Sequence, residues 1–592
     1  MGASFAVENR LSSAANSDQT SATVSESKDV EMVNVQINGT WMEFPKGTRM
    51  IEACRQAEAE VPHYCYHPKL SSPGNCRMCL VEMGMPPRLA PGQEAELDED
   101  GHKKIQWIPR PAIACANTVA NGMGIRTGSQ MVEECRQGVM EFLLINHPLD
   151  CPICDQAGEC RLQEFSVEHG NGESRFLEQK VKKPKNVDIG PRIRLDDERC
   201  IMCSRCIRFS QEIAEDDCLG FTDRGSHTVL STHPGKELAN NYSLNTADIC
   251  PVGALTSNDF RFQMRVWFLK ETKSICTGCG RGCNTLISSR ENTVHRQQPR
   301  DNDDVNSSWM CDSGRLDFHY LSSEARLTDP MILHDQGHRV ASWSEAHQLS
   351  AACLKALDPS QIAIVASARM TNEELFMVRR LAKELKVDLI DLIARPQDGD
   401  NFLISKDGNP NTTGASLVLG IDKPGSKLNA IRAGIDHGEI KAVLVFNENL
   451  FKAGFTDEVL GKLDFLLSTH LLANPTATLS NVVYPSAGFS EKRGSMINVT
   501  GRLQRLNQAT QPPGQVLEDW EVLRDLIQAI SGSNGLYMIE DVFKLMAAEI
   551  SEFANLSLSK ISDGGVPVID TGETIPLLER ERERVAKGII VG

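Results

Sequence analysis

Residues 200–206 read Cys200-Ile201-Met202-Cys203-Ser204-Arg205-Cys206, and a fourth cysteine follows at Cys250, directly before Pro251. Cysteines at this spacing are typical of an iron–sulfur site, because each cluster takes four protein ligands. Fifteen of the nineteen cysteines and one histidine divide into four complete sets. The sets are Cys65, Cys76, Cys79 and Cys115 (set 1); His147, Cys151, Cys154 and Cys160 (set 2); Cys200, Cys203, Cys206 and Cys250 (set 3); and Cys276, Cys279, Cys283 and Cys311 (set 4). Since such clusters mostly carry single electrons, we expect the chain to conduct electrons.

Set 3 resembles one half of a bacterial two-cluster ferredoxin. In that fold two C-x2-C-x2-C-x3-C-P runs each lend their fourth cysteine to the other cluster. Here Cys200 opens the first run and Cys250 closes the second, so one site is complete. The positions of the other four ligands carry Ser210, Asn240, Ser243 and Thr246. The pattern predicts a two-cluster fold reduced to one [4Fe–4S] site, which zinc binding would not explain.

Set 1 has the spacing C-x10-C-x2-C, with its fourth cysteine much further along the chain. Plant-type [2Fe–2S] ferredoxins use the same close pair and distant fourth ligand. Upstream, residues 33–37 alternate apolar and polar side chains, and Asn38-Gly39 supplies a hairpin turn. These features predict a β-grasp domain with a [2Fe–2S] cluster. A structural zinc site is the alternative.

Set 2 is unusual because one of its ligands is an imidazole. A lone histidine is normally a surface or core residue, but the three cysteines here lack a fourth thiolate. The nearest spare cysteine, Cys135, lies on the apolar stripe of a helix predicted over residues 129–146. The sequence therefore favours His147 as the fourth ligand. A neutral imidazole in place of a thiolate is expected to raise the cluster potential.

Set 4, with the spacing C-x2-C-x3-C-x27-C, resembles the cluster loop that opens molybdopterin oxidoreductases, and zinc is again the alternative. Gly314-Arg315 and Val483-Tyr484-Pro485 fit that resemblance. An enzyme of this type would need a further cysteine or selenocysteine ligand, for which Cys353 is the sole candidate. Because Cys353 lies on a helical stripe, we expect a scaffold without molybdopterin.

Strand–helix alternation predicts a mostly parallel α/β domain, with strands over 361–368, 387–392 and 441–446 and a helix over 372–385.

Charge and hydropathy exclude several classes of partner. The formal net charge of −17 argues against nucleic acid, because binding phosphates needs a basic face. No apolar run approaches the roughly 20 residues needed to span a membrane, so any membrane role is expected to pass through partner chains. The N-terminus lacks the pattern of a secretory signal or transit peptide, which makes the cytosol the default location.

The expected fold class is multidomain α+β and α/β. We expect a disordered tail (1–30), a β-grasp [2Fe–2S] ferredoxin-like domain (31–120), a histidine-ligated [4Fe–4S] domain (121–190), a reduced two-cluster ferredoxin domain with one [4Fe–4S] site (191–268), a [4Fe–4S] domain of molybdopterin-oxidoreductase type (269–325) and an α/β molybdopterin-oxidoreductase-like domain without cofactor (326–592). Cys54, Cys135 and Cys353 are expected to be buried in apolar surroundings, and Cys218 has no predicted role. The charged run 579–584 is expected to be a solvated helix.

The order of these sites resembles the large iron–sulfur subunits, or G subunits, of bacterial respiratory complex I, the NADH:quinone oxidoreductase. The resemblance covers roughly residues 32–519 and is most specific at His147-Pro148-Leu149-Asp150-Cys151-Pro152-Ile153-Cys154. It implies one [2Fe–2S] cluster in set 1 and [4Fe–4S] clusters in sets 2, 3 and 4. It also implies that electrons from a flavin-containing NADH-oxidising subunit pass through sets 1, 3 and 2 toward quinone, with set 4 off this route.

The same resemblance implies that the chain has no catalytic residues of its own. Its partners would be the peripheral-arm subunits, with membrane subunits contacted only indirectly, on the cytoplasmic side of a bacterial inner membrane. An alternative within the same chemistry is an electron-transfer subunit of an NAD-linked hydrogenase or formate dehydrogenase complex. Two other classes are a molybdopterin enzyme and a zinc-organised interaction scaffold. An iron-only hydrogenase is excluded, because only Cys353 follows Cys311.

Overall fold

The computed structural model describes residues 31–90, 94–532 and 535–590. By its internal contacts the chain divides into two units, which are described separately. Unit 1 comprises the residues up to Val61 and Leu80–Val132, and unit 2 comprises Pro62–Cys79 and Glu133–Gly592. The expected disordered tail, residues 1–30, lies outside the described residues.

Unit 1 is a mixed sheet with one short helix. The strand order is β2-β1-β6-β3-β4, with β5 also paired to β3, and β1 and β6 run parallel. The predicted hairpin is confirmed: Val33, Val35 and Ile37 are buried, and Asn38 and Gly39 both have positive φ. The elements are β1 (Met32–Ile37), β2 (Thr40–Pro45), α1 (Met50–Gln56), β3 (Leu80–Met85), β4 (Gln106–Trp107), β5 (Ala112–Ile113) and β6 (Met123–Arg126).

The first part of unit 2 consists of short helices and small antiparallel sheets joined by the cysteine-bearing loops. The sheets have the orders β11-β8-β7, β10-β9 and β12-β13-β14. The helix predicted over 129–146 is confirmed as α2. The elements are α2 (Gln130–Leu144), α3 (Arg161–His169), β7 (Val187–Asp188), β8 (Ile193–Leu195), α4 (Arg205–Glu212), β9 (Leu219–Thr222), β10 (Val229–Thr232), α5 (Asn245–Asp248), β11 (Leu255–Ser257), β12 (Lys270–Ile275), β13 (Asn284–Arg290), β14 (Thr293–Pro299) and α6 (Asp312–Arg315).

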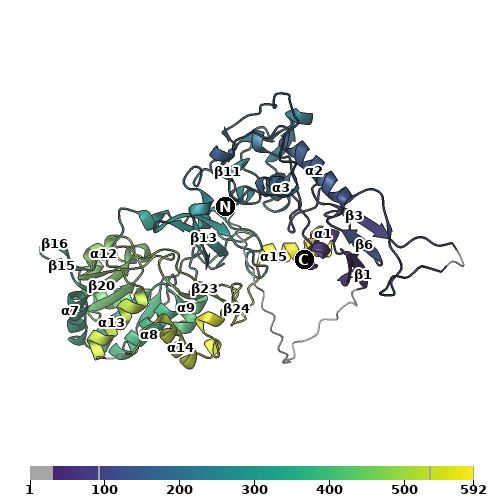
Figure 1. The fold of residues 1–592 in the computed structure, drawn as a ribbon. Helices are drawn as coiled ribbons and strands as arrows, with labels where there is room; N and C mark the ends of the chain where they lie inside the picture. Colours follow the sequence, from purple (N-terminus) through teal and green to yellow (C-terminus); the bar gives the residue numbers. More distant parts are fainter. Residues whose placement is uncertain (1–30, 91–93, 533–534, 591–592) are drawn as a thin grey trace, which may run out of the picture. The chain divides into compact units, whose positions relative to one another are not determined.

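The predicted α/β domain is present in the second part of unit 2 (Figure 1). Its sheet has the order β16-β15-β21-β20-β19-β17-β18, and the five strands from β21 to β18 run parallel. The strands are β15 (Met331–His334), β16 (Gly337–Val340), β17 (Ile362–Ala366), β18 (Ile390–Leu392), β19 (Ala442–Phe446), β20 (Phe465–His470) and β21 (Val482–Pro485). The helices are α7 (Trp343–Lys355), α8 (Asn372–Leu385), α9 (Thr412–Leu419), α10 (Leu428–Asp436), α11 (Asp457–Leu460), α12 (Pro475–Leu479), α13 (Asp519–Ser531) and α14 (Ile539–Glu549).

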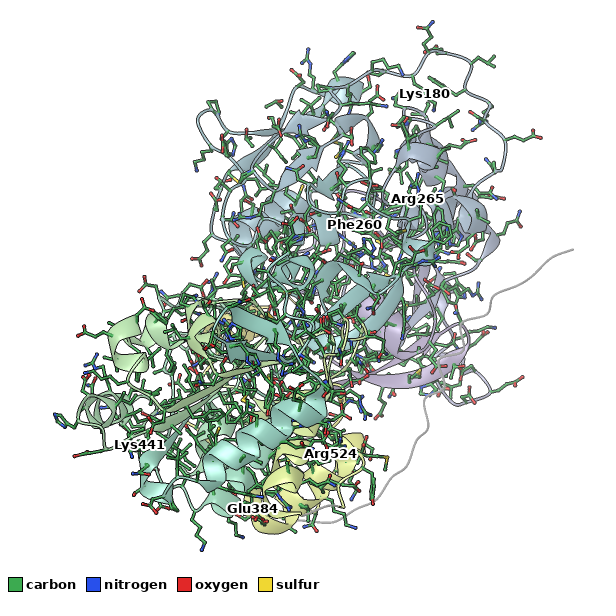
Figure 2. The ribbon with its side chains drawn as sticks, turned by 90° about the vertical axis from the view of Figure 1, so that its left-hand side faces the viewer. Lys180, Phe260, Arg265, Glu384, Lys441 and Arg524 are labelled. Atoms are coloured by element: carbon green, nitrogen blue, oxygen red, sulfur yellow. The ribbon has the colours of Figure 1, made fainter. Side chains whose placement is uncertain are left out.

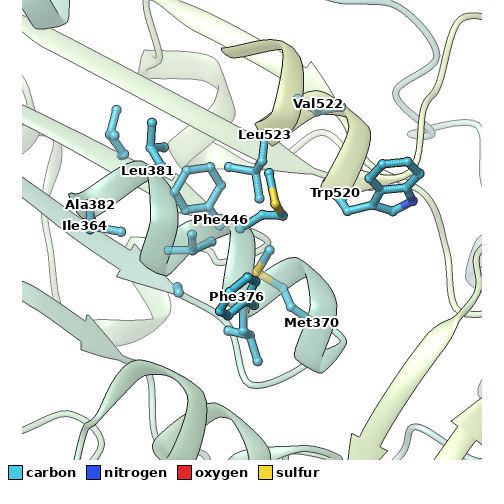
Figure 3. Packing of buried hydrophobic residues seen from close by; sticks show 14 of the residues in the cluster. Ile364, Met370, Phe376, Leu381, Ala382, Phe446, Trp520, Val522 and Leu523 are labelled. Atoms are coloured by element: carbon cyan, nitrogen blue, oxygen red, sulfur yellow. The ribbon is translucent and has the colours of Figure 1, made fainter. Parts of the chain in front are cut away.

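Alternate residues of the central strands face two apolar layers. Ile364 of β17 and Phe446 of β19 belong to the cluster formed with α7, α8, α13 and α14 (Figure 3). Val365 and Val443 belong to the opposite cluster, formed with α10 and α11. A parallel sheet buried on both faces explains why these strands are apolar at every position.

The C-terminal helix α15 (Pro576–Ala586) corrects one expectation. It contains the charged run 579–584, yet Leu577, Leu578 and Glu581 are buried. Arg584 donates to the backbone carbonyl of Glu212 at 3.1 Å. The helix packs onto the ferredoxin-like segment because the apolar residues that precede the charged run anchor it there. A further three-stranded sheet, β22 (Gly494–Ile497), β23 (Arg502–Leu506) and β24 (Val566–Pro567), completes the unit.

A buried carboxyl beside helix α8 makes the stability of this domain depend on pH. Burial raises the pKa of Glu373 to about 7, although Ser495 donates to its carboxylate at 2.7 Å. The folded state therefore binds a proton more tightly than the unfolded state, and this contribution is present below about pH 4.5 and lost as the pH rises through about 7.

We expect the opening free energy of helix α8, measured by amide hydrogen exchange, to fall by up to about 1 kcal/mol per pH unit between about pH 5 and pH 7. Glu373→Gln should flatten this slope. The matched change Glu384→Gln, on the exposed face of the same helix (Figure 2), should leave it unchanged. Equal slopes in the wild type and in Glu373→Gln would contradict the assignment.

Candidate iron–sulfur sites

The four cysteines of set 3 line one cavity in unit 2. Cys203 lies in a loop that Met202 and Ser204, both with positive φ, bend sharply, and Cys206 lies in the first turn of α4. Cys250 follows α5 and completes the lining of this cavity. Burial, followed by the neighbouring Cys203, raises the pKa of Cys250 to about 11. Thiols gathered in this way become thiolates only beside a compensating cationic centre such as iron, so this donor set fits a cluster.

The four positions predicted to have lost the ligands of a second site carry hydrogen-bonded polar groups. Ser243 donates to the carboxylate of Asp312 at 2.6 Å, and Thr246 donates to the carbonyl of Ser243 at 2.7 Å. Asn240 donates to Asp216 at 2.8 Å, and the Ser210 hydroxyl lies 3.3 Å from the Cys218 sulfur. These hydrogen bonds join the four positions to their neighbours, and Cys218 takes part through its contact with Ser210.

All four members of set 2 also line one cavity, together with Arg199 and Gly253. His147 follows the end of α2, while Cys154 and Cys160 are buried and Cys151 is exposed. Burial, assisted by Arg199 and Lys180, lowers the pKa of His147 to about 4. The imidazole is therefore neutral at physiological pH, as a metal ligand must be.

In set 4, Cys276 and Cys283 are buried in one cluster with Met310, and Cys311, the residue after Met310, is also buried. Cys279 is half-buried. Burial raises the pKa of the Cys276 thiol, and the charges of Cys311 and Cys279 raise it further. The Gly278 amide donates to the Cys276 sulfur at 3.4 Å, and the Gly314 amide donates to the Cys311 sulfur at 3.4 Å. A Cβ at Gly314 would lie about 3 Å from two of these sulfurs, so glycine is required for the close backbone approach.

The members of set 1 are distributed over both units of the chain. Cys65, Cys76 and Cys79 lie in segment 62–79 of unit 2, and Cys115 lies in unit 1. The backbone amide of Cys65 donates to the Cys76 sulfur at 3.4 Å. All four cysteines are buried. β5 ends at Ile113, and Cys115 lies in the turn that follows it.

Two side chains join the set 1 segment to set 3. Arg208 of α4 donates to the carbonyl of Cys65 at 2.5 Å and to that of Cys203 at 3.4 Å. Asn75, next to Cys76, donates to the carbonyl of Met202 at 3.1 Å. One guanidinium thus contacts the ligand-bearing backbone of both sets.

Sets 3 and 2 meet at residues 250–253. The Cys160 sulfur lies 3.8 Å from the carbonyl of Pro251. A Cβ on Gly253 would lie 2.1 Å from the Cys154 sulfur, so only glycine fits there. Arg199 donates to Asp150 at 3.1 Å and to the carbonyl of Gly253 at 3.3 Å. Arg265 (Figure 2) donates to the carbonyl of Cys154 at 2.6 Å. Residues 251–253, which directly follow Cys250 of set 3, therefore lie against two cysteines of set 2.

Set 4 reaches the ferredoxin-like segment by a different path. Asn245 donates to the carbonyl of Met310 at 2.8 Å, and Arg315 pairs with Asp248 at 2.5 Å. Together with the bond between Ser243 and Asp312, these contacts attach the residues around Cys311 to segment 243–248 of the ferredoxin-like region.

The spare cysteines agree only in part with expectation. Cys54 is buried as predicted, but Cys135 and Cys353 are only half-buried. In α7 the buried stripe runs through Ala346, Ser350 and Leu354, which leaves Cys353 at its edge. Over residues 31–90, 94–532 and 535–590, no group of three or more His, Cys, Asp or Glu side chains is close enough to hold a single metal ion. The ligands of sets 2 and 3 surround cavities and do not converge on one point.

Five family models match successive parts of the chain. They are described as 2Fe-2S iron-sulfur cluster binding domain (residues 30–130), NADH-ubiquinone oxidoreductase-G iron-sulfur binding region (136–175), NADH-quinone oxidoreductase subunit 3, ferredoxin-like domain (190–256), NADH-ubiquinone oxidoreductase NDSU1/NuoG-like, 4Fe-4S domain (269–319), and Molybdopterin oxidoreductase (408–529). The expected succession of [2Fe–2S], [4Fe–4S] and molybdopterin-oxidoreductase-like regions is confirmed, and with it the iron–sulfur cofactors. The ligand assignments remain predictions.

Curated relatives agree with these matches. The NADH-quinone oxidoreductase G subunit of Rickettsia bellii is 30% identical over 640 residues, which cover 89% of this chain and 90% of that protein. The protein of the same name from Rickettsia felis is 41% identical over 354 residues, or 60% of this chain, and there the chain spans about half (49%) of the relative's length. A solved NAD+-reducing nickel–iron hydrogenase is 27% identical with a TM-score of 0.32, covering 40% of this chain and 91% of that one.

None of the helices in the described part of the chain combines the length and apolar character required to cross a membrane.

Proposed function

Because the chain belongs to the family of NADH-quinone oxidoreductase G subunits, we propose that it carries electrons within a proton-translocating NADH:quinone oxidoreductase. It would take them from a flavin-containing NADH-oxidising subunit and pass them toward quinone. The observation that carries this proposal is the unbroken series of contacts from the set 1 segment through set 3 to set 2, made by Arg208 and by residues 250–253.

The ligands proposed for the [2Fe–2S] cluster are those of set 1, and the ligands for three [4Fe–4S] clusters are those of sets 2, 3 and 4. When bound, these clusters supply one-electron redox chemistry. Arg208 places a positive charge between sets 1 and 3, where it would offset the negative charge of the thiolates. The neutral His147 would make the set 2 site less negative than an all-cysteine site and would raise its potential. The Gly278 and Gly314 amides, which donate to cysteine sulfurs, would likewise raise the potential of the set 4 cluster.

We propose that electrons pass first through set 1, then through set 3 and then through set 2. Set 4 would lie off this route, since Met310 and Asp312, on either side of Cys311, bond to Asn245 and Ser243, in the half of the fold that we propose has lost its ligands. We also propose the six-part division given above, with residues 326–592 as a scaffold without molybdopterin.

The proposed partners are the flavin subunit and the other peripheral-arm subunits of complex I. The chain would be held peripherally, on the cytoplasmic side of a bacterial inner membrane, through those partners. No residue is assigned to substrate chemistry: the chain's own part is to bind, orient and insulate the electron carriers.

Deletion of this chain tests the proposal. Membranes from the deletion strain should lose NADH:quinone reductase activity and should regain it with the wild-type chain. Reduction of an artificial acceptor that takes electrons directly from the flavin should persist wherever the flavin subunit is still present. Unchanged quinone reduction, with loss of hydrogen-dependent NAD+ reduction instead, would contradict the proposal and favour the hydrogenase alternative.

A further inference from the structure

Two arginines of helix α4 each join the segment that carries set 1 to a loop that carries set 3. Arg208 is buried, and its guanidinium donates to the carbonyl of Cys65 at 2.5 Å and to that of Cys203 at 3.4 Å. It also donates to the carbonyl of Ser71 and, at 3.3 Å, to the hydroxyl of Ser204. All of these acceptors are neutral, so none of them offsets the positive charge of the arginine.

Arg205 repeats this arrangement one turn earlier in the helix. Its guanidinium donates at 3.1 Å to the carbonyl of Ile249, which precedes Cys250, and donates also to the carbonyl of Tyr66, which follows Cys65. The Arg205 side chain also lines the cavity that the four cysteines of set 3 surround. Two cations therefore lie between the backbone segments that carry the ligands of the two sets.

Neither arginine forms an ion pair with a carboxylate. Within residues 31–90, 94–532 and 535–590, no Asp or Glu oxygen is paired with either guanidinium at 4.0 Å or less. The charge of Glu212 acts on Arg208, but that carboxylate is paired with Arg584 and accepts a hydrogen bond from the Ser71 amide at 3.0 Å. A buried cation is costly unless a negative charge lies beside it. We therefore expect another source of negative charge next to these two side chains.

The groups that can supply this charge are the cluster cysteines. Burial lowers the pKa of Arg205, and the thiols that oppose this effect belong to both sets: they are Cys203, Cys65 and Cys250. The nearby His67 adds no charge, because burial, followed by the two arginines, lowers its pKa to about 3. Reduction of a cluster adds one negative charge to it. A fixed cation nearby therefore stabilises the reduced form more than the oxidised form.

We infer that Arg205 and Arg208 together set the reduction potentials of the clusters in sets 1 and 3. Each cation favours the reduced form of both clusters and so raises both potentials. Because the same charges act on both clusters, a change at either arginine shifts the two potentials in the same direction. This inference rests on the proposed electron-carrier function, in which sets 1 and 3 are consecutive. The shared charge eases the entry of electrons into this pair of clusters.

The test is a redox titration, followed by EPR, of the full chain purified anaerobically with its clusters. Arg205→Gln and Arg208→Gln should each lower the equilibrium constant for one-electron reduction of the set 1 and set 3 clusters by about tenfold, which is about 59 mV. The potential of the set 2 cluster should change less, since neither arginine lines that cavity. Arg224→Gln removes an exposed charge from the same ferredoxin-like segment and should leave all potentials unchanged, because water and salt screen it.

Arg208→Lys separates the charge from the hydrogen bonds. Lysine keeps the positive charge but lacks the planar fork that reaches several carbonyls at once. It should therefore retain most of the wild-type potential at both sets. A shift as large as that of Arg208→Gln would show that hydrogen bonding, and not charge, is responsible, and would overturn the inference. Unchanged potentials in both glutamine variants, or a shift at set 3 alone, would also overturn it.

Loss of a cluster in a variant is equally decisive. If Arg208→Gln lost the set 3 signal and Arg208→Lys kept it, the need for a compensating charge would be supported, whereas loss in both variants would count against it. These readouts do not involve quinone. Four wild-type signals with unchanged potentials in the variants would remove this inference alone, while a wild-type chain without the clusters would remove the proposed function itself.

Discussion

Replacing Cys206 by alanine is expected to remove the set 3 cluster and to reduce NADH:quinone reductase activity by more than about 100-fold. That figure is the upper range for the loss of a group that only supports a metal ligand, and a direct ligand should cost more. Cys206 lines the same cavity as the other three members of set 3. In the proposed order this set lies between sets 1 and 2, so its loss interrupts the route. The activity assay on assembled complex and the set 3 EPR signal together measure the effect.

Cys218→Ala is the matched control for this experiment. Cys218 is also buried, lies in the same ferredoxin-like segment and contacts Ser210, but belongs to none of the four sets. It should retain all cluster signals and most of the activity, with at most a modest loss of stability. If the two variants lost the set 3 signal alike, ligation by Cys206 would not be the cause.

Gly253→Ala should disrupt the contact between sets 3 and 2. The new methyl group would lie 2.1 Å from the Cys154 sulfur and 3.2 Å from the Cβ of Gln156, so the loop carrying Cys154 must move. Forcing an extra methyl into a filled site costs about 1–3 kcal/mol. We expect the set 2 EPR signal to be lost or displaced, and electron transfer to stop after set 3, while the set 3 signal remains.

Gly138→Ala is the control for this second prediction. Gly138 lies in α2, and a Cβ there would meet no atom within 4 Å. Because alanine also favours a helix more than glycine does, this variant should keep the set 2 signal. A wild-type set 2 signal in Gly253→Ala would contradict the close contact between residues 250–253 and Cys154.

Much of the fold, and the ligand sets that we propose, follow from short-range patterns in the sequence. Helix α8 has the predicted bounds 372–385, because Thr371 and Glu374 form reciprocal cap hydrogen bonds at its start. The cysteine spacing predicts one surviving site in the ferredoxin-like segment and identifies the four emptied positions. Sets 2 and 3 each line one cavity, as their spacing requires.

What the sequence did not reveal depends on contacts between distant residues. Arg208 joins Cys65 to Cys203, and no local pattern pairs residues so far apart, although a basic side chain two positions after a cluster cysteine could have suggested a charge-compensating role. The burial of α15 was missed because its charged run conceals Leu577 and Leu578 just before it. The half-exposure of Cys353 depends on which helix face meets the sheet, and that is decided by packing.

The measurement that tests the central claim most directly is low-temperature EPR of the anaerobically purified chain after reduction, with iron counted in the same sample. The account predicts one [2Fe–2S] and three [4Fe–4S] signals with about 14 iron atoms per chain. Fewer than four distinct clusters, or stoichiometric zinc in place of iron, would contradict it.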